Sequence, residues 1–284
     1  MSNGQPYPVV FDNHFHLRHD GDFLEAVRKF SLAGGTAINL TNLPDHSLGT
    51  EGYYEKIFDR TLGMAEVIRR ETEVFVMVTL GPYPMDYFFF REHGKDAKQN
   101  MFYGIDLAAR LYSQGKISAI GEIGLPHFKV EPGVMESIEE VLSHAFEVCG
   151  DMGIPVVLHT GDLSPFDVES LCSRAVIAGM KCSSVVKHHG TPDLLGNPSG
   201  MIISLPATRD NARQGARSAD RFMIETDYID DPLDRNKFLP PDSVPKRAAM
   251  IRQEYENWEK ILEGIFVETP KIAYSLVPSG IINK

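Results

Sequence analysis

The chain alternates short apolar runs with longer amphipathic segments, and this alternation is the feature that most constrains its fold. The short runs are rich in Val, Ile or Phe, which is typical of buried strands. They are PVVFDNHF, TAINLTN, VFVMVTLG, ISAIGEIG, PVVLHTG, SVVKHHG, MIISLPA and RFMIETDY. Helical segments are expected after seven of them, at 22–33, 52–71, 104–114, 135–152, 165–178, 209–218 and 244–262.

Eight such units in 284 residues predict an α/β fold, a closed parallel (β/α)8 TIM barrel with its helices outside. A doubly wound sheet would need a glycine-rich phosphate turn after an early strand, and the chain contains no G-x-G-x-x-G. The sixth connection, TPDLLGNPSG, has few helical residues, so we expect that unit to be degenerate. No stretch resembles an interdomain linker, and we predict a single domain over residues 1–284.

The net charge of −11 opposes binding to long nucleic acids or to anionic membranes, because both need a basic surface. No apolar run approaches the roughly 20 residues of a membrane helix. MSNGQPYP lacks the basic and apolar regions of a signal peptide, so we expect a cytoplasmic protein. The three cysteines, Cys149, Cys172 and Cys182, are expected to be buried reduced thiols.

Ligand-type side chains end several of the predicted strands. In FDNHFHL, His14 and His16 are two residues apart and therefore point the same way on a strand. The carboxyl ends of all barrel strands meet on one rim, so His14 and His16 would lie close to the ligand-type residues that end other strands. These others are Glu122, His159, His188 or His189, and Asp227. The convergence predicts a metal site, since a packed core does not accommodate such groups without compensation.

Imidazole and carboxylate ligands suit zinc, manganese or iron-type ions, and the set is too rich in nitrogen for calcium. Four histidines and two carboxylates exceed what one tetrahedral zinc needs. We therefore expect two divalent ions that share a bridging carboxylate and a bridging hydroxide. Zinc is the first expectation, and Mg, Mn, Fe or Ni are alternatives. Taken singly, Glu122 could cap a turn and Asp227 could be a helix N-cap; the joint pattern favours the metal site.

In the sixth strand either His188 or His189 could point inward. If His189 did, Lys187 would share its face beside the metals, where an ammonium is costly. This favours His188 as the ligand. The remaining histidines, His19, His46, His93 and His144, are expected on loops or helix surfaces.

Several residues follow strand ends and are candidates for holding a small or short anionic substrate: His127, His189, Arg18, Arg209, Arg235 and Lys237. The connections 82–100 and 229–244 are long and follow strand ends, as lids and binding walls do. Within the first, the three phenylalanines 88–90 are expected in a packed loop or a subunit contact. A nucleophile elbow and a P-loop are absent from the sequence, and no cysteine neighbours a strand-end histidine.

FDNHFHL, IGEIGLP, VVLHTG, VVKHHG and IETDY follow the order of the amidohydrolase superfamily motifs. Within it the chain most resembles the TatD-related metal-dependent hydrolases of an archaeal-type branch, whose terminal segment is similar to ETPKIAYSL. The resemblance implies a barrel that holds one or two divalent metals. It assigns His14, His16 and Asp227 to the more buried metal, His159 and His188 to the second, and Glu122 to both. It also makes Asp12 a partner that fixes an imidazole.

The chain departs from the TatD pattern in two places. His189-Gly190-Thr191 replaces a Cys-Phe-Ser-Gly-like turn, and GEIGLPHF lacks the acid after Leu125. Both differences are expected near the substrate. The resemblance therefore supports the metal ligands more strongly than it supports DNase activity.

The expected activity is hydrolysis by a metal-bound hydroxide, since bound metals lower the pKa of water towards ~7. Asp227 would take the proton of the nucleophile and pass it to the leaving group, and Glu122 would hold both ions. A phosphoester is the first expected substrate, for a nuclease or a small-phosphoester hydrolase. Alternatives are an amide, lactone or deaminating hydrolase, a lyase or isomerase, and a metal-binding barrel that acts as a binding module. A homo-oligomer is left open.

Overall fold

The computed structural model describes residues 9–218, 221–231 and 239–276. Its strands are β1 (Phe11–His16), β2 (Ala37–Thr41), β3 (Phe75–Leu80), β4 (Ala119–Gly124), β5 (Val156–His159), β6 (Val185–Lys187), β7 (Ile202–Pro206) and β8 (Phe222–Glu225). They form one parallel sheet in the order β1 to β8. The predicted (β/α)8 barrel is thereby confirmed.

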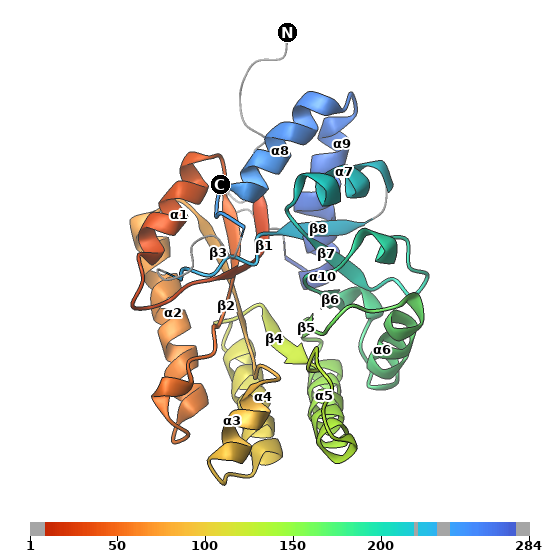
Figure 1. Cartoon of the computed structure of the whole chain (residues 1–284). Coiled ribbons are helices and arrows are strands. Elements are labelled where there is room, and N and C mark those ends of the chain that lie inside the picture. The colour runs from red at the N-terminus through yellow and green to blue at the C-terminus, as the bar shows by residue number, and fades with distance from the viewer. Residues whose placement is uncertain (1–8, 219–220, 232–238, 277–284) are drawn as a thin grey trace.

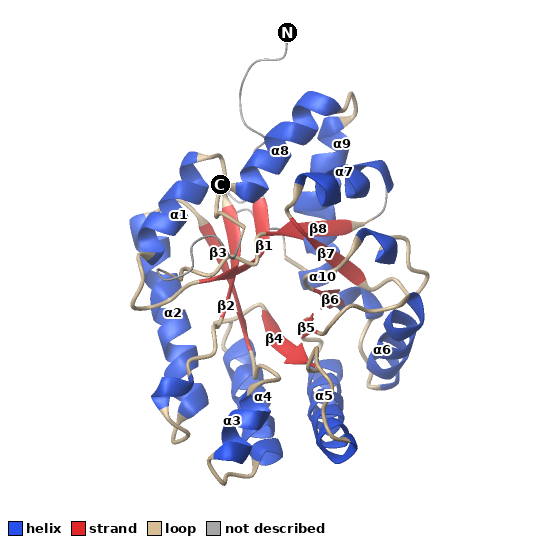
Figure 2. Ribbon diagram, in the orientation of Figure 1, coloured by secondary structure: helices blue, strands red, loops and turns tan. Residues whose placement is uncertain are grey.

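Main-chain contacts bring the first and last strands together. The amide of His16 donates to the carbonyl of Tyr228 at 2.8 Å, and the amide of Asp227 donates to the carbonyl of His14 at 3.1 Å. Phe15 and Tyr228 form a parallel bridge. The strands lie inside and the helices outside, as Figures 1 and 2 show.

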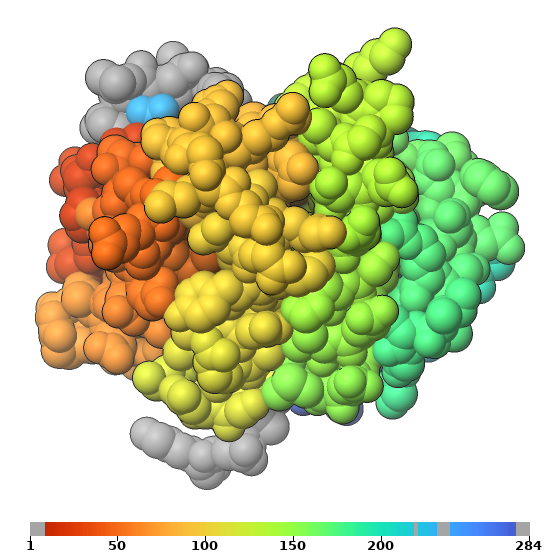
Figure 3. All heavy atoms as spheres, turned by 90° about the horizontal axis from the view of Figure 1, so that it is seen from below, coloured from red at the N-terminus to blue at the C-terminus, as the bar shows by residue number. Residues whose placement is uncertain are grey.

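The longer helices are α1 (Phe23–Leu32), α2 (Tyr53–Glu71), α4 (Ala97–Ser113), α5 (Pro132–Met152), α6 (Pro165–Ile177), α7 (Arg209–Ser218) and α8 (Ser243–Glu254). The shorter ones are α3 (Asp86–Glu92), α9 (Trp258–Glu263) and α10 (Thr269–Tyr274), with the π-helical turn η4 (Gly264–Glu268). The 3-10 turns are η1 (His46–Leu48), η2 (Cys182–Ser184) and η3 (Pro192–Leu194). Seen from below, α4, α5 and α6 pack side by side over the barrel wall (Figure 3).

Local sequence signals explain where several helices begin and end. Ser164 and Asp167 form a capping box at the start of α6, where Pro165 occupies the first turn. Helix α5 begins at Pro132 and ends at Met152, and it is followed by Gly153, which has a φ of 68°. Glycine adopts this left-handed conformation without strain at its Cβ position, which makes it a common residue at a helix end.

Three expectations about the helices are corrected or refined. The connection 82–100 was expected to be a loop, but it contains helix α3. Phe89 and Phe90 on this helix are buried in the core. Helix α4 begins at Ala97, before the predicted 104. The predicted last helix, 244–262, breaks between α8 and α9. The sixth connection holds only the turn η3, as expected.

The expectation of three reduced cysteines is wrong for two of them. Cys172 on α6 and Cys182 in η2 form a disulfide, and Cys149 is free and buried. Their Cα atoms are 5.4 Å apart, because α6 packs against η2. Among the residues described, no helix combines the length and apolarity needed to cross a bilayer.

Candidate metal centre

The first half of the site is built by β1 and the turn after β8. The Nε2 atoms of His14 and His16 lie 3.1 Å apart, and each lies 3.0 Å from Oε1 of Glu122. Oδ1 of Asp227 is 3.5 Å from Nε2 of His16 and 3.9 Å from Nε2 of His14. Ligands about 2.0–2.1 Å from a tetrahedral zinc are roughly 3.3 Å apart. Four donor atoms therefore surround a volume suited to one ion.

The second half lies on the other side of Glu122. Its Oε2 atom is 2.6 Å from Nδ1 of His159 and 3.0 Å from Nε2 of His188. The two ring nitrogens are 3.0 Å apart. Glu122 thus presents one oxygen to each pair of imidazoles, as a carboxylate that bridges two ions does.

The protonation of His16 is consistent with a cation in the first half of the cluster. Nδ1 of His16 lies 3.0 Å from the carbonyl oxygen of Thr41, which can only accept, so this nitrogen carries hydrogen. A neutral His16 ring therefore directs the Nε2 lone pair at Glu122. Burial alone would lower the pKa of His16, yet hydrogen bonds to Asp227 and Glu122 raise it to about 10. Without a metal, a proton must balance these carboxylates, and the donor set fits a divalent ion in its place.

Two backbone features bring the ligands together. A Cβ on Gly124 would lie 1.9 Å from the carbonyl oxygen of His159, so only glycine permits this approach of β4 to β5. Asp227 has a φ of 49°, in the left-handed region that Asp tolerates better than most residues. This turn directs its carboxylate back over His16.

Asp12 does not hold an imidazole, which corrects the role that the resemblance implied. Its Oδ1 accepts the amides of Thr226 at 2.9 Å and of His14 at 3.3 Å, and its Oδ2 accepts the Thr226 hydroxyl at 2.8 Å. Asp12 therefore fixes the backbone of β1 and of the turn after β8.

Glu225 is an acid that the sequence analysis missed. One of its oxygens accepts the His189 amide at 2.6 Å and lies 3.4 Å from Nδ1 of His188. The other accepts from Asn13 at 3.4 Å, and the Tyr274 hydroxyl donates to Asn13 at 2.7 Å. Its position at the end of the apolar run RFMIE was the signal available, because ligand-type residues end the other strands in the same way.

The ambiguity in the sixth strand has a clear geometric outcome. The ring of His188 enters the cluster, while His189 is exposed with a φ of 49°. Lys187 is buried, and its Nζ donates to the carbonyls of His188 at 2.6 Å and Thr160 at 3.1 Å. These carbonyl oxygens offset the cost of burying the Lys187 ammonium.

Another buried acid, Asp86, fixes the loop after β3 beside the cluster. It accepts hydrogen bonds from the hydroxyls of Tyr53 at 3.1 Å and Tyr54 at 3.2 Å and from the amide of Tyr83 at 3.0 Å. His46 Nε2 lies 3.0 Å from the same carboxylate, and its ring stacks on Phe89. His46 is exposed in the turn η1, as expected, and its ring covers Phe89 from the surface.

The predicted substrate residues lie at different places. The His127 ring is 5.8 Å from the His159 ring, beside the cluster. Arg209 is exposed at the start of α7. Arg235 and Lys237 lie outside the described residues.

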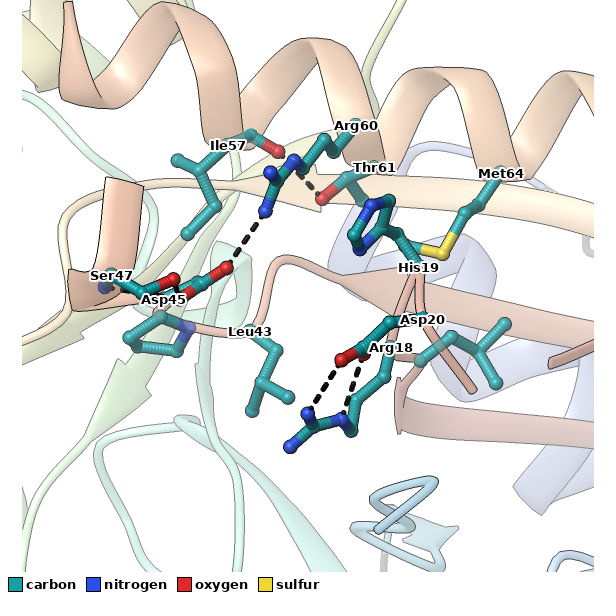
Figure 4. Close-up of a pocket in the computed structure, with 12 residues that line it drawn as sticks. Arg18, His19, Asp20, Leu43, Asp45, Ser47, Ile57, Arg60, Thr61 and Met64 are labelled. Atoms are coloured by element: carbon teal, nitrogen blue, oxygen red, sulfur yellow. Dashed lines mark hydrogen bonds and ion pairs between the residues drawn. The ribbon is translucent and has the colours of Figure 1, made fainter. Parts of the chain in front are cut away.

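Arg18 lies at a separate cavity of about 160 Å³ between α2 and the loops after β1 and β2. Its guanidinium makes two hydrogen bonds to Asp20, at 3.0 and 2.9 Å. Arg60 donates to Asp45 at 2.7 Å on the opposite wall (Figure 4). Each arginine there already faces a carboxylate, so an anion would have to compete for it.

A sequence model of the family described as "TatD related DNase" matches residues 11–275. A curated relative, the uncharacterized protein MJ1127 of Methanocaldococcus jannaschii, is 29% identical over 243 residues. The aligned region covers 84% of this chain and 85% of that protein.

Solved structures share the fold. The TatD homolog YJJV from Escherichia coli K12 has a TM-score of 0.62 and 17% identity, covering 93% of this chain and 98% of that one. The TatD-like protein AF1765 from Archaeoglobus fulgidus has a TM-score of 0.56 and 18% identity, with coverages of 88% and 95%. Organophosphorus hydrolase from Deinococcus radiodurans has a TM-score of 0.58 and 14% identity, with coverages of 94% and 92%.

Proposed function

Since this chain belongs to the TatD-related DNase family, we propose that it hydrolyses phosphoester bonds of small or short anionic substrates with two divalent ions, zinc first among the candidates. It has the fold of TatD-family metal-dependent hydrolases and a buried His/Glu/Asp cluster of the metal-site type. The observation that carries the proposal is the position of Glu122. Its two oxygens face two separate pairs of imidazoles at 2.6 to 3.0 Å.

The bound ions would supply an activated water and a Lewis acid that polarises a substrate oxygen. Asp227 is the more exposed of the two cluster carboxylates, with a quarter of its side chain accessible. Burial would raise the pKa of Asp227, but the His16 hydrogen bond and the neighbouring imidazoles hold it below its ordinary value. Asp227 is therefore ionised at neutral pH and can accept the proton of the attacking water and return it to the leaving group.

The substrate class rests on charge. The net charge of −11 disfavours a long polyanion, while a nucleotide or a short single-stranded end needs only the local field of the site. The His127 ring lies 5.8 Å from the His159 ring, and His127 is proposed to contact the substrate. Contacts of His189, Arg209 and Arg235 with the substrate are proposed at the rim, and an anion that reached Arg18 would have to compete with Asp20 for it.

The test is metal analysis followed by a substrate panel. Chelator-treated protein is reloaded with Zn, Mn, Mg, Fe or Ni and assayed on bis(4-nitrophenyl) phosphate, 4-nitrophenyl phosphate, a short oligonucleotide, a lactone and an amide. We expect two ions per chain, phosphoester turnover, and solvent ¹⁸O in the product.

His14→Ala and Asp227→Ala should each lower kcat/KM by about 10²-fold or more, as loss of a metal ligand or proton acceptor does. His144→Ala is the matched control, because His144 pairs with Asp106 on the helical surface. Phosphoester activity that survives both ligand variants would contradict the assigned site. Turnover of the lactone or amide alone would instead select the alternative hydrolase classes.

A further inference from the structure

Tyr83, in the loop after β3, contacts the cluster from outside. Its hydroxyl oxygen is 3.3 Å from Nε2 of His159, and the two rings meet nearly edge to face at 4.7 Å. His159 turns its other nitrogen, Nδ1, towards Glu122 and His188. If Nδ1 gives its lone pair to a metal, the neutral ring carries hydrogen on Nε2. His159 then donates to the oxygen of Tyr83.

The hydrogen of the Tyr83 hydroxyl is consequently left for another acceptor. Within residues 9–218, 221–231 and 239–276, the only hydrogen-bond partner of the Tyr83 hydroxyl is His159. A tyrosine hydroxyl has an ordinary pKa of about 10, so it is protonated at neutral pH. It is a half-buried donor beside the second half of the site, with one hydrogen to give.

The donor is also fixed in place. The amide of Tyr83 donates to Asp86. The hydroxyls of Tyr53 and Tyr54 donate to the same carboxylate. A Cβ on Gly104 would lie 2.8 Å from Pro82, so α4 packs directly against this loop. A donor held in advance stabilises developing charge without reorganisation when the reaction occurs.

We propose that the Tyr83 hydroxyl donates a hydrogen bond to a phosphoryl oxygen of the substrate at the half of the site formed by His159 and His188. The inference rests on the proposed function and adds to it a residue that stabilises negative charge in the transition state. The sequence does not single out Tyr83, because the aromatic segment PYPMDYFFF gives no sign of which ring faces the candidate metal ligands.

Tyr83→Phe tests the proposal because it removes the hydroxyl and keeps the ring. Tyr87→Phe, on the helix that follows the same loop, is the matched control. Three quantities are measured on each zinc-loaded protein: kcat and KM for bis(4-nitrophenyl) phosphate, affinity for inorganic phosphate by calorimetry, and affinity for each metal ion. For Tyr83→Phe we expect kcat to fall about 10- to 100-fold, as loss of one transition-state donor does. Phosphate binding should weaken several-fold, and both metal affinities should stay within about twofold of wild type. Tyr87→Phe should match wild type throughout.

Each of the other outcomes contradicts either the role of Tyr83, the proposed function, or both. Unchanged kcat and phosphate affinity in Tyr83→Phe would show that the hydroxyl does not reach the substrate. Selective weakening of the second metal would make Tyr83 a positioning residue for His159 and overturn the proposed contact. Wild-type protein that binds two ions and phosphate but hydrolyses no ester would refute the proposed function alone, and phosphate affinity would still decide the role of Tyr83. Wild-type protein that binds no phosphate would refute both.

Discussion

The carboxylate of Glu225 lies 3.4 Å from Nδ1 of His188, whose Nε2 lies 3.0 Å from Glu122. Both side chains are buried. A carboxylate behind a metal-ligating imidazole fixes its tautomer and orientation and increases its basicity. Glu225 is thus placed to orient His188 within the second half of the candidate metal centre.

Glu225→Gln should weaken the second metal site by about 10- to 100-fold, because the charge behind His188 is removed while a side chain of similar shape is kept. The first site should change little. Calorimetric titration of the chelator-treated protein with zinc measures both, and Glu139→Gln on the exposed face of α5 is the control. Equal weakening at both sites, or at neither, would contradict this role.

The two halves of the cluster should lose metal separately. His188→Ala removes a ligand from the second half and leaves the donors of the first half, His14, His16, Asp227 and one oxygen of Glu122, intact. His16→Ala should do the reverse. Native mass spectrometry should find about one ion per chain in each variant and two in wild type. A His188→Ala protein that still holds two ions would refute the division into halves.

Asp12 should make the stability of the metal-free protein pH-dependent. Burial raises the pKa of Asp12 from 3.8 to about 8, although bonds from Thr226 and His14 oppose the rise. Between these values the unfolded chain is ionised and the folded chain is protonated. The free energy of unfolding therefore falls as the pH rises through this window, by at most about 1.4 kcal/mol per pH unit.

Asp12→Asn has no such titration, so its stability relative to wild type should improve from pH 5 to pH 7.5. Urea unfolding in the presence of a chelator measures the difference. Curves that stay parallel across this range would show that Asp12 is ionised in the folded state.

The disulfide between Cys172 and Cys182 should add stability, because it closes a loop with a sequence separation of 10. Loop-closure entropy predicts about 2–3 kcal/mol for a loop of this length. A reductant should lower the Tm of wild type and leave the Cys172→Ser/Cys182→Ser variant unchanged. Thiol counting by mass spectrometry should find one free thiol, at Cys149, and three free thiols in oxidised wild type would disprove the bond.

The barrel was predictable because the strands are buried and short runs rich in Val, Ile or Phe alternate with amphipathic segments. The positions of ligand-type residues at strand ends were predictable for the same reason, since a polar group at the end of such a run is conspicuous. Helix α3 was not predictable, because its aromatic residues have no clear polar face. The disulfide also escaped prediction, since a cysteine pair is defined by a distance that sequence spacing does not give.

The sequence by itself determined which residue types stand at the strand ends, and thereby a metal-type cluster with more donors than one ion needs. Only the tertiary structure decided which oxygen of Glu122 faces which imidazoles, that His188 and not His189 turns inward, and that Glu225 and Tyr83 stand behind the ligands. The physical reason is that strand periodicity fixes the face of a side chain, while hydrogen bonds depend on tenths of an ångström between atoms far apart in the chain. Those distances are set when β4, β5, β6 and β8 pack around one axis.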